Sequence, residues 1–281
     1  MRQHTLTRAH LAAYARHLRA LERSPGTVDN YLRAARAFAA WLDGGAVQAG
    51  SAGDWKAHLL DTGYAPVTVN ARLAAVNGLF RFLGWDGFQT RLLRLQRRLF
   101  RAPERELTRE HYRRLLSAAQ GRGDGRLALL IEAICATGIR VSEVRCLTLE
   151  AARRGRADIR CKGKVRTILL PGKLCRKLRA WAKKQNIPSG ELFLTRKGKS
   201  LSRRQIWGEL KALAVRAGVD PARVFPHNLR HLFAVTFYRA CRDVARLADV
   251  LGHSSLETTR IYLATSGAEH CRALDRLGLV T

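Results

Sequence analysis

A histidine and a tyrosine near the end of the chain have the types and spacing of an acid and a nucleophile. Gly252 ends one predicted helix, so His253 falls at a turn, and Ser254 can cap the next helix while Glu257 reaches back in a capping box. Tyr262 follows about two helical turns later. This pair can act on an electrophile only if cations from elsewhere in the chain converge on it. Without those cations, the stretch is an ordinary amphipathic helix with a packed tyrosine.

Two other stretches carry cations at helical spacing. Arg140 and Glu143 are three residues apart and would face the same way on a helical turn, where a structural ion pair is the alternative interpretation. His227 and Arg230 have the same spacing and follow Pro226, which favours a helix start. The two stretches together can supply guanidiniums and an imidazole to one anion.

Two lysines fall at the tip of a predicted hairpin. Residues 157–170 contain β-branched runs separated by polar turn residues, which is typical of two short strands. Lys162 and Lys164 lie between these runs. The sequence therefore predicts a mobile, lysine-rich hairpin tip.

Four short amphipathic helices, and no strand, are predicted before residue 85. Their apolar residues recur at helical spacing, and Ser24-Pro25 and Ala65-Pro66 supply helix starts. From Trp85 to Glu106 repeated cations with one proline indicate an extended or partly helical linker along phosphates, with a solvated linker as the alternative. Its arginines are Arg91, Arg94, Arg97, Arg98, Arg101 and Arg105.

The second region is predicted to be mainly helical around the hairpin. Thr108 can cap its first helix, and Ser142 is a candidate cap after the turn at Gly138. Lys197 and Lys199 belong to a basic turn. The predicted fold class is mainly α with a small β-hairpin, divided into a helical bundle over residues 1–84, a basic linker over 85–105 and a second domain over 106–281.

The charge balance indicates a polyanionic partner. The 281 residues include 51 Lys and Arg against 22 Asp and Glu, a formal net charge of +29. Nucleic acid is the leading partner, because the cations are spread over the chain rather than gathered on one amphipathic face as a membrane surface would require. The six cysteines lie far apart without metal-ligand spacing, so we expect reduced thiols. No signal-peptide pattern or membrane-spanning run occurs, which predicts a cytoplasmic protein without membrane contact.

As an ordered set, these residues resemble the tyrosine recombinase (phage integrase) family, which includes chromosome-dimer-resolving recombinases and integrases of mobile elements. The resemblance covers nearly the whole chain and implies a helical, SAM-like core-binding domain followed by an α+β catalytic domain. The motifs that carry it are Ala136-Thr137-Gly138-Ile139-Arg140-Val141-Ser142-Glu143, His227-Asn228-Leu229-Arg230-His231, and Leu251-Gly252-His253-Ser254-Ser255 followed by Tyr262.

The resemblance implies a role for each site residue. Tyr262 would attack a DNA phosphodiester, leaving a 3′-phosphotyrosine and a free 5′-hydroxyl. Arg140 and Arg230 would hold the non-bridging oxygens, and His253 would hydrogen-bond the same phosphate. His227 would accept the phenolic proton or organise the oxyanion site.

The resemblance also implies a proton donor for the leaving oxygen, which is a lysine of the hairpin. Lys162 aligns better than Lys164, and the choice between them stays open. Glu143 would support Arg140. Tyr238 is a rival hydroxyl, but it lacks the family's spacing from His253.

The implied partners are double-stranded DNA with paired inverted binding sites, further copies of the chain in a tetramer on DNA, and accessory DNA-bending proteins. No cofactor is implied, because the covalent intermediate keeps the energy needed for rejoining. The activity is then site-specific recombination or integration. The alternatives are strand relaxation of the type IB topoisomerase kind and a catalytically silent DNA-binding relative.

Overall fold

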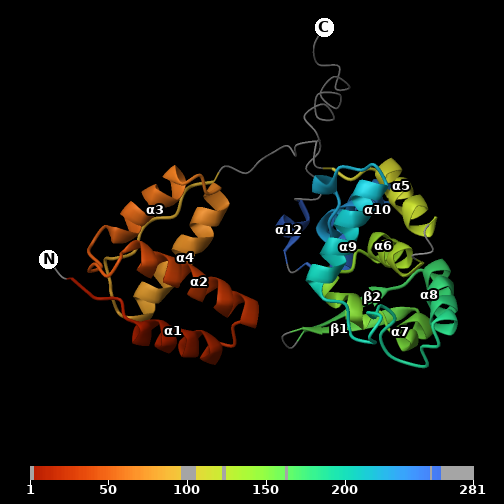
Figure 1. Cartoon of the computed structure of the whole chain (residues 1–281), viewed down its shortest axis with the longest axis horizontal. Coiled ribbons are helices and arrows are strands. Elements are labelled where there is room, and N and C mark those ends of the chain that lie inside the picture. The colour runs from red at the N-terminus through yellow and green to blue at the C-terminus, as the bar shows by residue number, and fades with distance from the viewer. Residues whose placement is uncertain (1–2, 96–105, 122–124, 162–163, 254, 261–281) are drawn as a thin grey trace, which may run out of the picture. The chain divides into compact units, whose positions relative to one another are not determined.

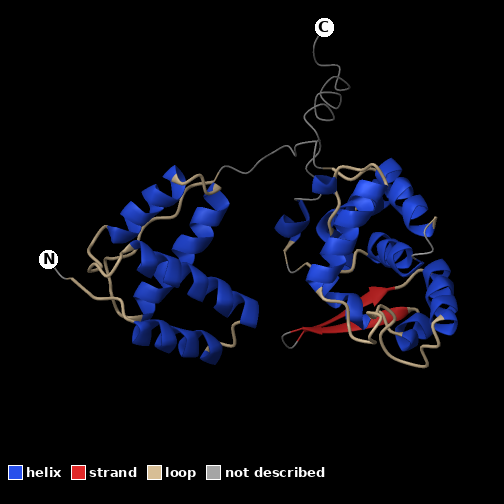
Figure 2. Cartoon of the chain, in the orientation of Figure 1, coloured by secondary structure: helices blue, strands red, loops and turns tan. Residues whose placement is uncertain are grey.

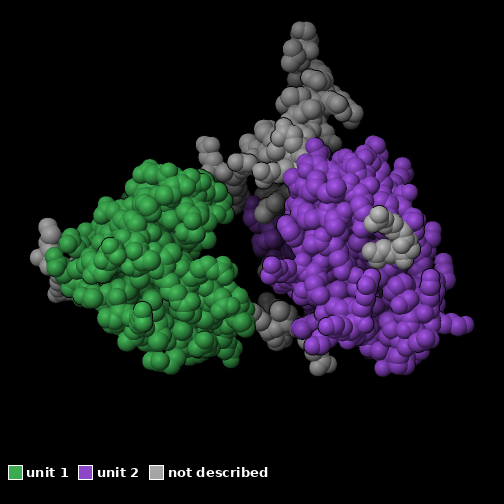
Figure 3. All heavy atoms as spheres, in the orientation of Figure 1, with its two compact units in different colours: residues 1–97 green, residues 98–281 purple. Residues whose placement is uncertain are grey.

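The computed structural model describes residues 3–95, 106–121, 125–161, 164–253 and 255–260. The chain divides into two compact units, residues 1–97 and 98–281 (Figure 3). Each unit has its own buried apolar cores.

Unit 1 is a bundle of four helices, as the apolar spacing predicted. Ser24 accepts a hydrogen bond from the amide of Thr27, and proline occupies the first turn of the second and fourth helices. Phe38, Trp55 and Phe80 are at most 1% exposed and form the centre of the bundle. The helices are α1 (Arg8–Ala20), α2 (Pro25–Trp41), α3 (Ser51–Asp61) and α4 (Pro66–Phe82) (Figure 1).

The segment after α4 belongs to unit 1 beyond residue 85, where the sequence predicted that the linker begins. Trp85 and Phe88 are buried in the core formed by α2, α3 and α4. Asn77 exchanges two hydrogen bonds with the backbone of Thr90, at 2.8 and 3.1 Å, and Asn70 binds the backbone of residue 93 in the same way. Up to residue 95, therefore, the segment is anchored to α4 by side chains that satisfy its backbone.

Unit 2 is mainly helical, with one antiparallel hairpin in the part of the chain that is described (Figure 2). Its helices begin as expected at Thr108, which accepts from the amide of His111, and at Pro226. Ser142 does not cap a helix, because it lies within a short 3-10 turn, η2, that starts directly after Arg140. The elements are α5 (Arg109–Gln120), α6 (Gly125–Thr137), η2 (Val141–Cys146), α7 (Leu149–Arg154), β1 (Arg156–Cys161), β2 (Lys164–Leu169), α8 (Gly172–Lys184), α9 (Arg203–Arg216), η3 (Pro221–Arg223), α10 (Pro226–Cys241), α11 (Val244–Leu251) and α12 (Leu256–Arg260).

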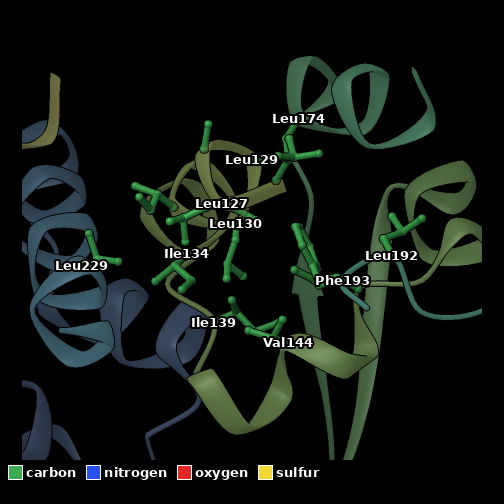
Figure 4. Packing of buried hydrophobic residues seen from close by; sticks show 14 of the residues in the cluster. Leu127, Leu129, Leu130, Ile134, Ile139, Val144, Leu174, Leu192, Phe193 and Leu229 are labelled. Carbon is green, nitrogen blue, oxygen red and sulfur yellow. The ribbon is translucent and has the colours of Figure 1, made fainter. Parts of the chain in front are cut away.

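Helix α6 is the centre of unit 2. Leu127, Leu130 and Ile134 are at most 1% exposed and pack among residues from η2, α8 and α10 (Figure 4). A helix that is apolar on all sides is stable only when other elements enclose it. The C-terminal end of α6, at Thr137, is thereby fixed against α10, with which it makes extensive contact.

Two expectations about composition can be compared with the described residues. Cys135, Cys146, Cys175 and Cys241 have free thiols, and Cys175 is buried. None of the described helices combines the length and the apolar character that crossing a bilayer requires.

Candidate functional site

Arg230 joins three segments that are far apart in the sequence. It lies on α10 and is only 3% exposed. Its Nη1 donates to the carbonyl of Gly138, while its Nη2 donates to the carbonyl of Leu251 at 2.8 Å and lies 3.0 Å from Nε2 of His253. One buried guanidinium therefore holds the 136–143 motif and the 251–253 motif together.

The turn at Gly138 requires glycine for two reasons. Its φ is +63°, and a Cβ at this position would lie 2.5 Å from a ring carbon of Phe233 and 2.9 Å from Leu251. Thr137 is buried and its hydroxyl accepts from the amide of Ile139 at 3.2 Å. This close packing aims the carbonyl of Gly138 at Arg230.

Arg140 follows this turn, and its guanidinium is partly exposed. Glu143 accepts from Arg140 Nη1 at 3.0 Å and from the Arg140 backbone amide at 2.9 Å. Arg140 Nη2 donates to the carbonyl of Gly252 at 3.3 Å. The Arg140 side chain is 41% exposed, so it can reach a ligand while Glu143 holds its direction.

His253 is neutral in this arrangement. A guanidinium can only donate, so Nε2 accepts from Arg230, and Nδ1 carries the proton that is shared with the hydroxyl of Thr259 at 2.8 Å. Burial, and then the charges of Arg230 and Arg140, lower the pKa of His253 to about 4. The imidazole is therefore an acceptor in the absence of an anion.

His227 and Tyr238 lie near opposite ends of α10, His227 in the first turn and Tyr238 in the last. His227 is exposed in the first turn of the helix, and it makes the smallest of the contributions that lower the pKa of His253. Tyr238 is half-buried against the small apolar cluster of Ala234, Leu247 and Leu251. Arg140 and Arg230 thus form a cationic site beside the neutral His253 that could neutralise one tetrahedral anion, and His227 is the further imidazole that acts on His253 electrostatically.

Family models match both units. The model described as "Phage integrase family" matches residues 105–269, more than half of the chain. The chain belongs to the phage integrase family. The model "Phage integrase, N-terminal SAM-like domain" matches residues 11–87, which include α2, α3, α4 and most of α1.

Relatives in this family are similar over nearly the full length. Tyrosine recombinase XerA of Thermococcus kodakarensis is 33% identical over 258 residues, covering 89% of this chain and 88% of the relative. Tyrosine recombinase XerD of Xanthomonas campestris pv. campestris is 31% identical over 264 residues, covering 84% and 81%.

Solved structures show the same fold. XerH recombinase bound to its difH substrate, in a pre-cleavage complex, gives a TM-score of 0.61 at 23% identity over 77% of this chain and 67% of that chain. A lambda integrase tetramer bound to a Holliday junction gives a TM-score of 0.74 at 17% identity, covering 92% and 77%.

Some of the other predicted catalytic and DNA-contact residues lie in the described part of the chain, and others do not. Lys164 begins β2 opposite Cys161, so it lies in the strand rather than in the turn. Arg91 and Arg94 are exposed on the segment held by α4, and Lys197 and Lys199 are exposed at the turn after residue 195. The predicted residues that lie outside the described part are Tyr262, Lys162, Ser254, Arg97, Arg98, Arg101 and Arg105.

Two residues that contact the candidate site were not predicted. Thr259 is fully buried and binds His253, and nothing in its local sequence distinguishes it from any helix-surface threonine. Arg166 lies on β2 and pairs with Glu143 at 3.8 Å. The sequence could have predicted that Arg166 points inwards, because alternation along the strand puts it on the same face as Ile168 and Leu170, which are buried.

Proposed function

We propose that this phage integrase family member is a site-specific DNA recombinase that cuts and rejoins strands through a 3′-phosphotyrosine intermediate. The observation that carries the proposal is the convergence of Arg140, Arg230 and His253 on one location through the contacts of Arg230. Two guanidiniums and an imidazole suit the five-coordinate phosphorus of a phosphodiester, on whose non-bridging oxygens negative charge grows during attack.

The proposed cleavage step makes one bond and breaks one. The phenolic oxygen of Tyr262 bonds to phosphorus, the bond from phosphorus to O5′ breaks, and the strand end becomes a 3′-phosphotyrosine. His227 takes the phenolic proton, and Lys162, or Lys164 as the alternative, gives a proton to O5′. Rejoining reverses these transfers when a 5′-hydroxyl from a second DNA attacks the phosphotyrosine.

Phosphate binding changes what His253 can do. Its Nε2 accepts from Arg230 in the absence of an anion, and a phosphate close to Arg140 and Arg230 would offset the charges that lower its pKa. A protonated Nε2 can then donate to a phosphate oxygen. We therefore assign His253 a hydrogen bond to the scissile phosphate that forms on DNA binding, with Glu143 keeping Arg140 in place.

The DNA grip uses both units. We propose that unit 1 and unit 2 bind opposite sides of the duplex, with the arginines between Arg91 and Arg105 crossing it and the turn of Lys197 and Lys199 adding phosphate contacts. The net charge of +29 and the exposure of Arg91 and Arg94 support this assignment.

The working assembly is proposed to be a tetramer on paired inverted sites, with accessory DNA-bending proteins as further partners. Lambda integrase, which shares the fold, forms a tetramer on a Holliday junction. The helix expected after Tyr262 would supply the contact between copies, with packing onto its own domain as the alternative. An enzyme of this kind must reach DNA, which supports the cytoplasmic location expected from the sequence.

The experiment that tests the function is recovery of DNA covalently attached to the protein in cells, followed by sequencing of the attached ends. The proposal predicts 3′-attached ends at one or a few sequences, and none with Tyr262→Phe. Ends scattered over the genome, or relaxation of supercoiled plasmid without recombined product, would favour topoisomerase-like swivelling. No covalent DNA at all would make the protein a silent DNA-binding relative. The sequenced ends also separate mobile-element integration or excision from chromosome-dimer resolution.

A further inference from the structure

Arg166 is a charged residue on the inner face of the hairpin. In the register of β1 and β2 it lies opposite Ile159, and two residues later Ile168 lies opposite Ala157. These three apolar partners are at most 5% exposed. Because successive residues of a strand alternate between faces, Arg166 points into unit 2 with them, and its side chain is only 14% exposed.

The guanidinium of Arg166 lacks a hydrogen-bond acceptor among the described residues. Its Nε, Nη1 and Nη2 are all buried, and an oxygen of Glu143 lies 3.8 Å from Nη2, beyond hydrogen-bonding distance. Leaving a buried donor unsatisfied destabilises the folded protein, and more so when the group is charged. A buried charge of this kind needs an explanation, and a bound anion would supply one.

The stem of Arg166 lies against Gly252. Gly252 has a φ of +61°, and a Cβ there would lie 2.1 Å from Cδ and 2.6 Å from Nε of Arg166. The carbonyl of the same glycine accepts from Arg140, and the next residue is His253. Arg166 is therefore in contact with the residue that connects two members of the candidate site.

The surrounding charges are unbalanced. Among the described ion pairs, Glu143 is the one carboxylate that faces Arg140 and Arg166, so these two guanidiniums exceed it by one positive charge. Burial lowers the pKa of Arg166 to about 10 in spite of Glu143, so the side chain keeps its charge at neutral pH. Arg166 also contributes to the low pKa of His253. A phosphodiester would bring the negative charge that this cluster lacks.

We propose that Arg166 is a further positioning residue of the phosphate site, whose buried charge strengthens the binding of the scissile phosphate in the transition state and whose stem fixes the hairpin against the turn at Gly252. This inference depends on the proposed strand-cleavage function. Arg166 acts through the electric field and through its neighbours, because its three side-chain nitrogens are buried.

The test compares cleavage of two substrates that differ only in charge at the scissile position, a normal phosphodiester and a neutral methylphosphonate. The variants are Arg166→Met and Arg166→Lys, and the matched control is Arg156→Met, which removes an exposed charge from the same hairpin. The methionine variant should cleave the phosphodiester at least about tenfold more slowly than the unmodified chain, and it should lose much less on the neutral substrate. The lysine variant should lose less than the methionine variant, and the control should match the unmodified chain.

Equal losses of Arg166→Met on both substrates would overturn the inference, because they would show a packing role without a charge effect. No loss on either substrate would overturn it as well. If the methionine variant does not fold, Arg166→Gln replaces it under the same criteria. Failure of the proposed function is distinguishable, since the unmodified chain would then form no covalent adduct with the phosphodiester.

Discussion

The imidazole of His253 is held as a neutral acceptor between the guanidinium of Arg230 and the hydroxyl of Thr259. Arg230 donates to Nε2, the Nδ1–H donates to the hydroxyl of Thr259, and the charges of Arg230, Arg140 and Arg166 all lower the pKa of the ring. Such a site is prepared for an anion, because the anion both fills the cationic surface and permits the imidazole to bind a proton.

This arrangement predicts a dependence of stability on pH. The folded-state pKa of His253, about 4, lies below its ordinary value of 6.5. Above pH 6.5 the ring is neutral in both states, and its contribution to stability is complete. Between about pH 6.5 and 4 the unfolded chain binds a proton that the folded site does not bind, so stability falls as the pH falls, by up to about 3 kcal/mol from this one group.

Replacement of His253 by glutamine should remove that part of the pH dependence. Glutamine keeps hydrogen-bonding groups without a titrating ring, so the difference in free energy of unfolding between the variant and the unmodified chain should change between pH 7 and pH 4. Chemical denaturation at several pH values measures it. A difference that stays constant over this range would contradict the assigned state of His253.

At the residue scale, the sequence revealed the members of the site that belong to motifs and missed those that do not. Arg140, His227, Arg230 and His253 stand at recognisable spacings within motifs that resemble a family. Thr259 takes part only because α12 places its hydroxyl beside His253, and local spacing does not encode that contact. The inward orientation of Arg166 follows from strand alternation, but its position against Gly252 depends on the packing of β2 against a turn more than 80 residues away.

At the scale of elements, the end of α6 and the start of η2 position the first arginine. The turn at Gly138 connects them, and its carbonyl is one of the acceptors of Arg230. The helical pattern predicted for the second region agrees with α6, but Ser142, the expected cap, lies within η2 instead. That pattern could not show that the turn packs directly on Phe233 and Leu251, because both belong to helices that follow much later in the chain.

Replacement of Gly138 by alanine should therefore cost more than the loss of a left-handed turn. The matched control is Gly155→Ala, where φ is +74° and nothing lies within 4 Å of the added Cβ. The control should lower the free energy of unfolding by about 1 kcal/mol, and Gly138→Ala by about 2–4 kcal/mol, because the second variant adds overpacking to the same backbone strain. Urea unfolding of the two variants measures the difference, and equal losses would contradict the packing described at this turn.

The segment after α4 was predicted to be a linker, but it is anchored to unit 1. Repeated arginines indicated a linker from residue 85, but the aromatic side chains of Trp85 and Phe88 pack into the first core. The pattern of charges predicts which residues are exposed. It does not predict that Asn70 and Asn77 bind the backbone of this segment. Asn70 and Asn77 fix the segment so that Arg91 and Arg94 remain exposed.

For the whole molecule, the dominant property is the charge of +29. If both units bind phosphates, the logarithm of DNA affinity should fall linearly with the logarithm of salt concentration, with a loss of about 10³-fold or more between 50 and 200 mM salt. Fluorescence anisotropy with a short duplex measures the slope. An affinity that is the same at low and moderate salt would contradict the proposed grip.

The slope can also locate the contacts. Replacing Arg91 and Arg94 by glutamine should reduce its magnitude by about 2, roughly one for each phosphate contact. Lys177→Gln is the control, because Lys177 is already paired with Glu132 at 2.6 Å, and its slope should not change. Equal slopes for all three proteins would remove the first two arginines from the DNA interface.

The most direct measurement of the central claim is to identify the amino acid that becomes bonded to DNA. The protein is incubated with a nicked substrate that carries a sequence recovered from cells, the adduct is digested, and the modified peptide is sequenced by mass spectrometry. The account predicts a single phosphotyrosine at Tyr262 on the 3′ strand end, absent in Tyr262→Phe and strongly reduced in Arg230→Gln. An adduct at Tyr238 or at any other residue, or one that forms equally well without the guanidinium of Arg230, would contradict it.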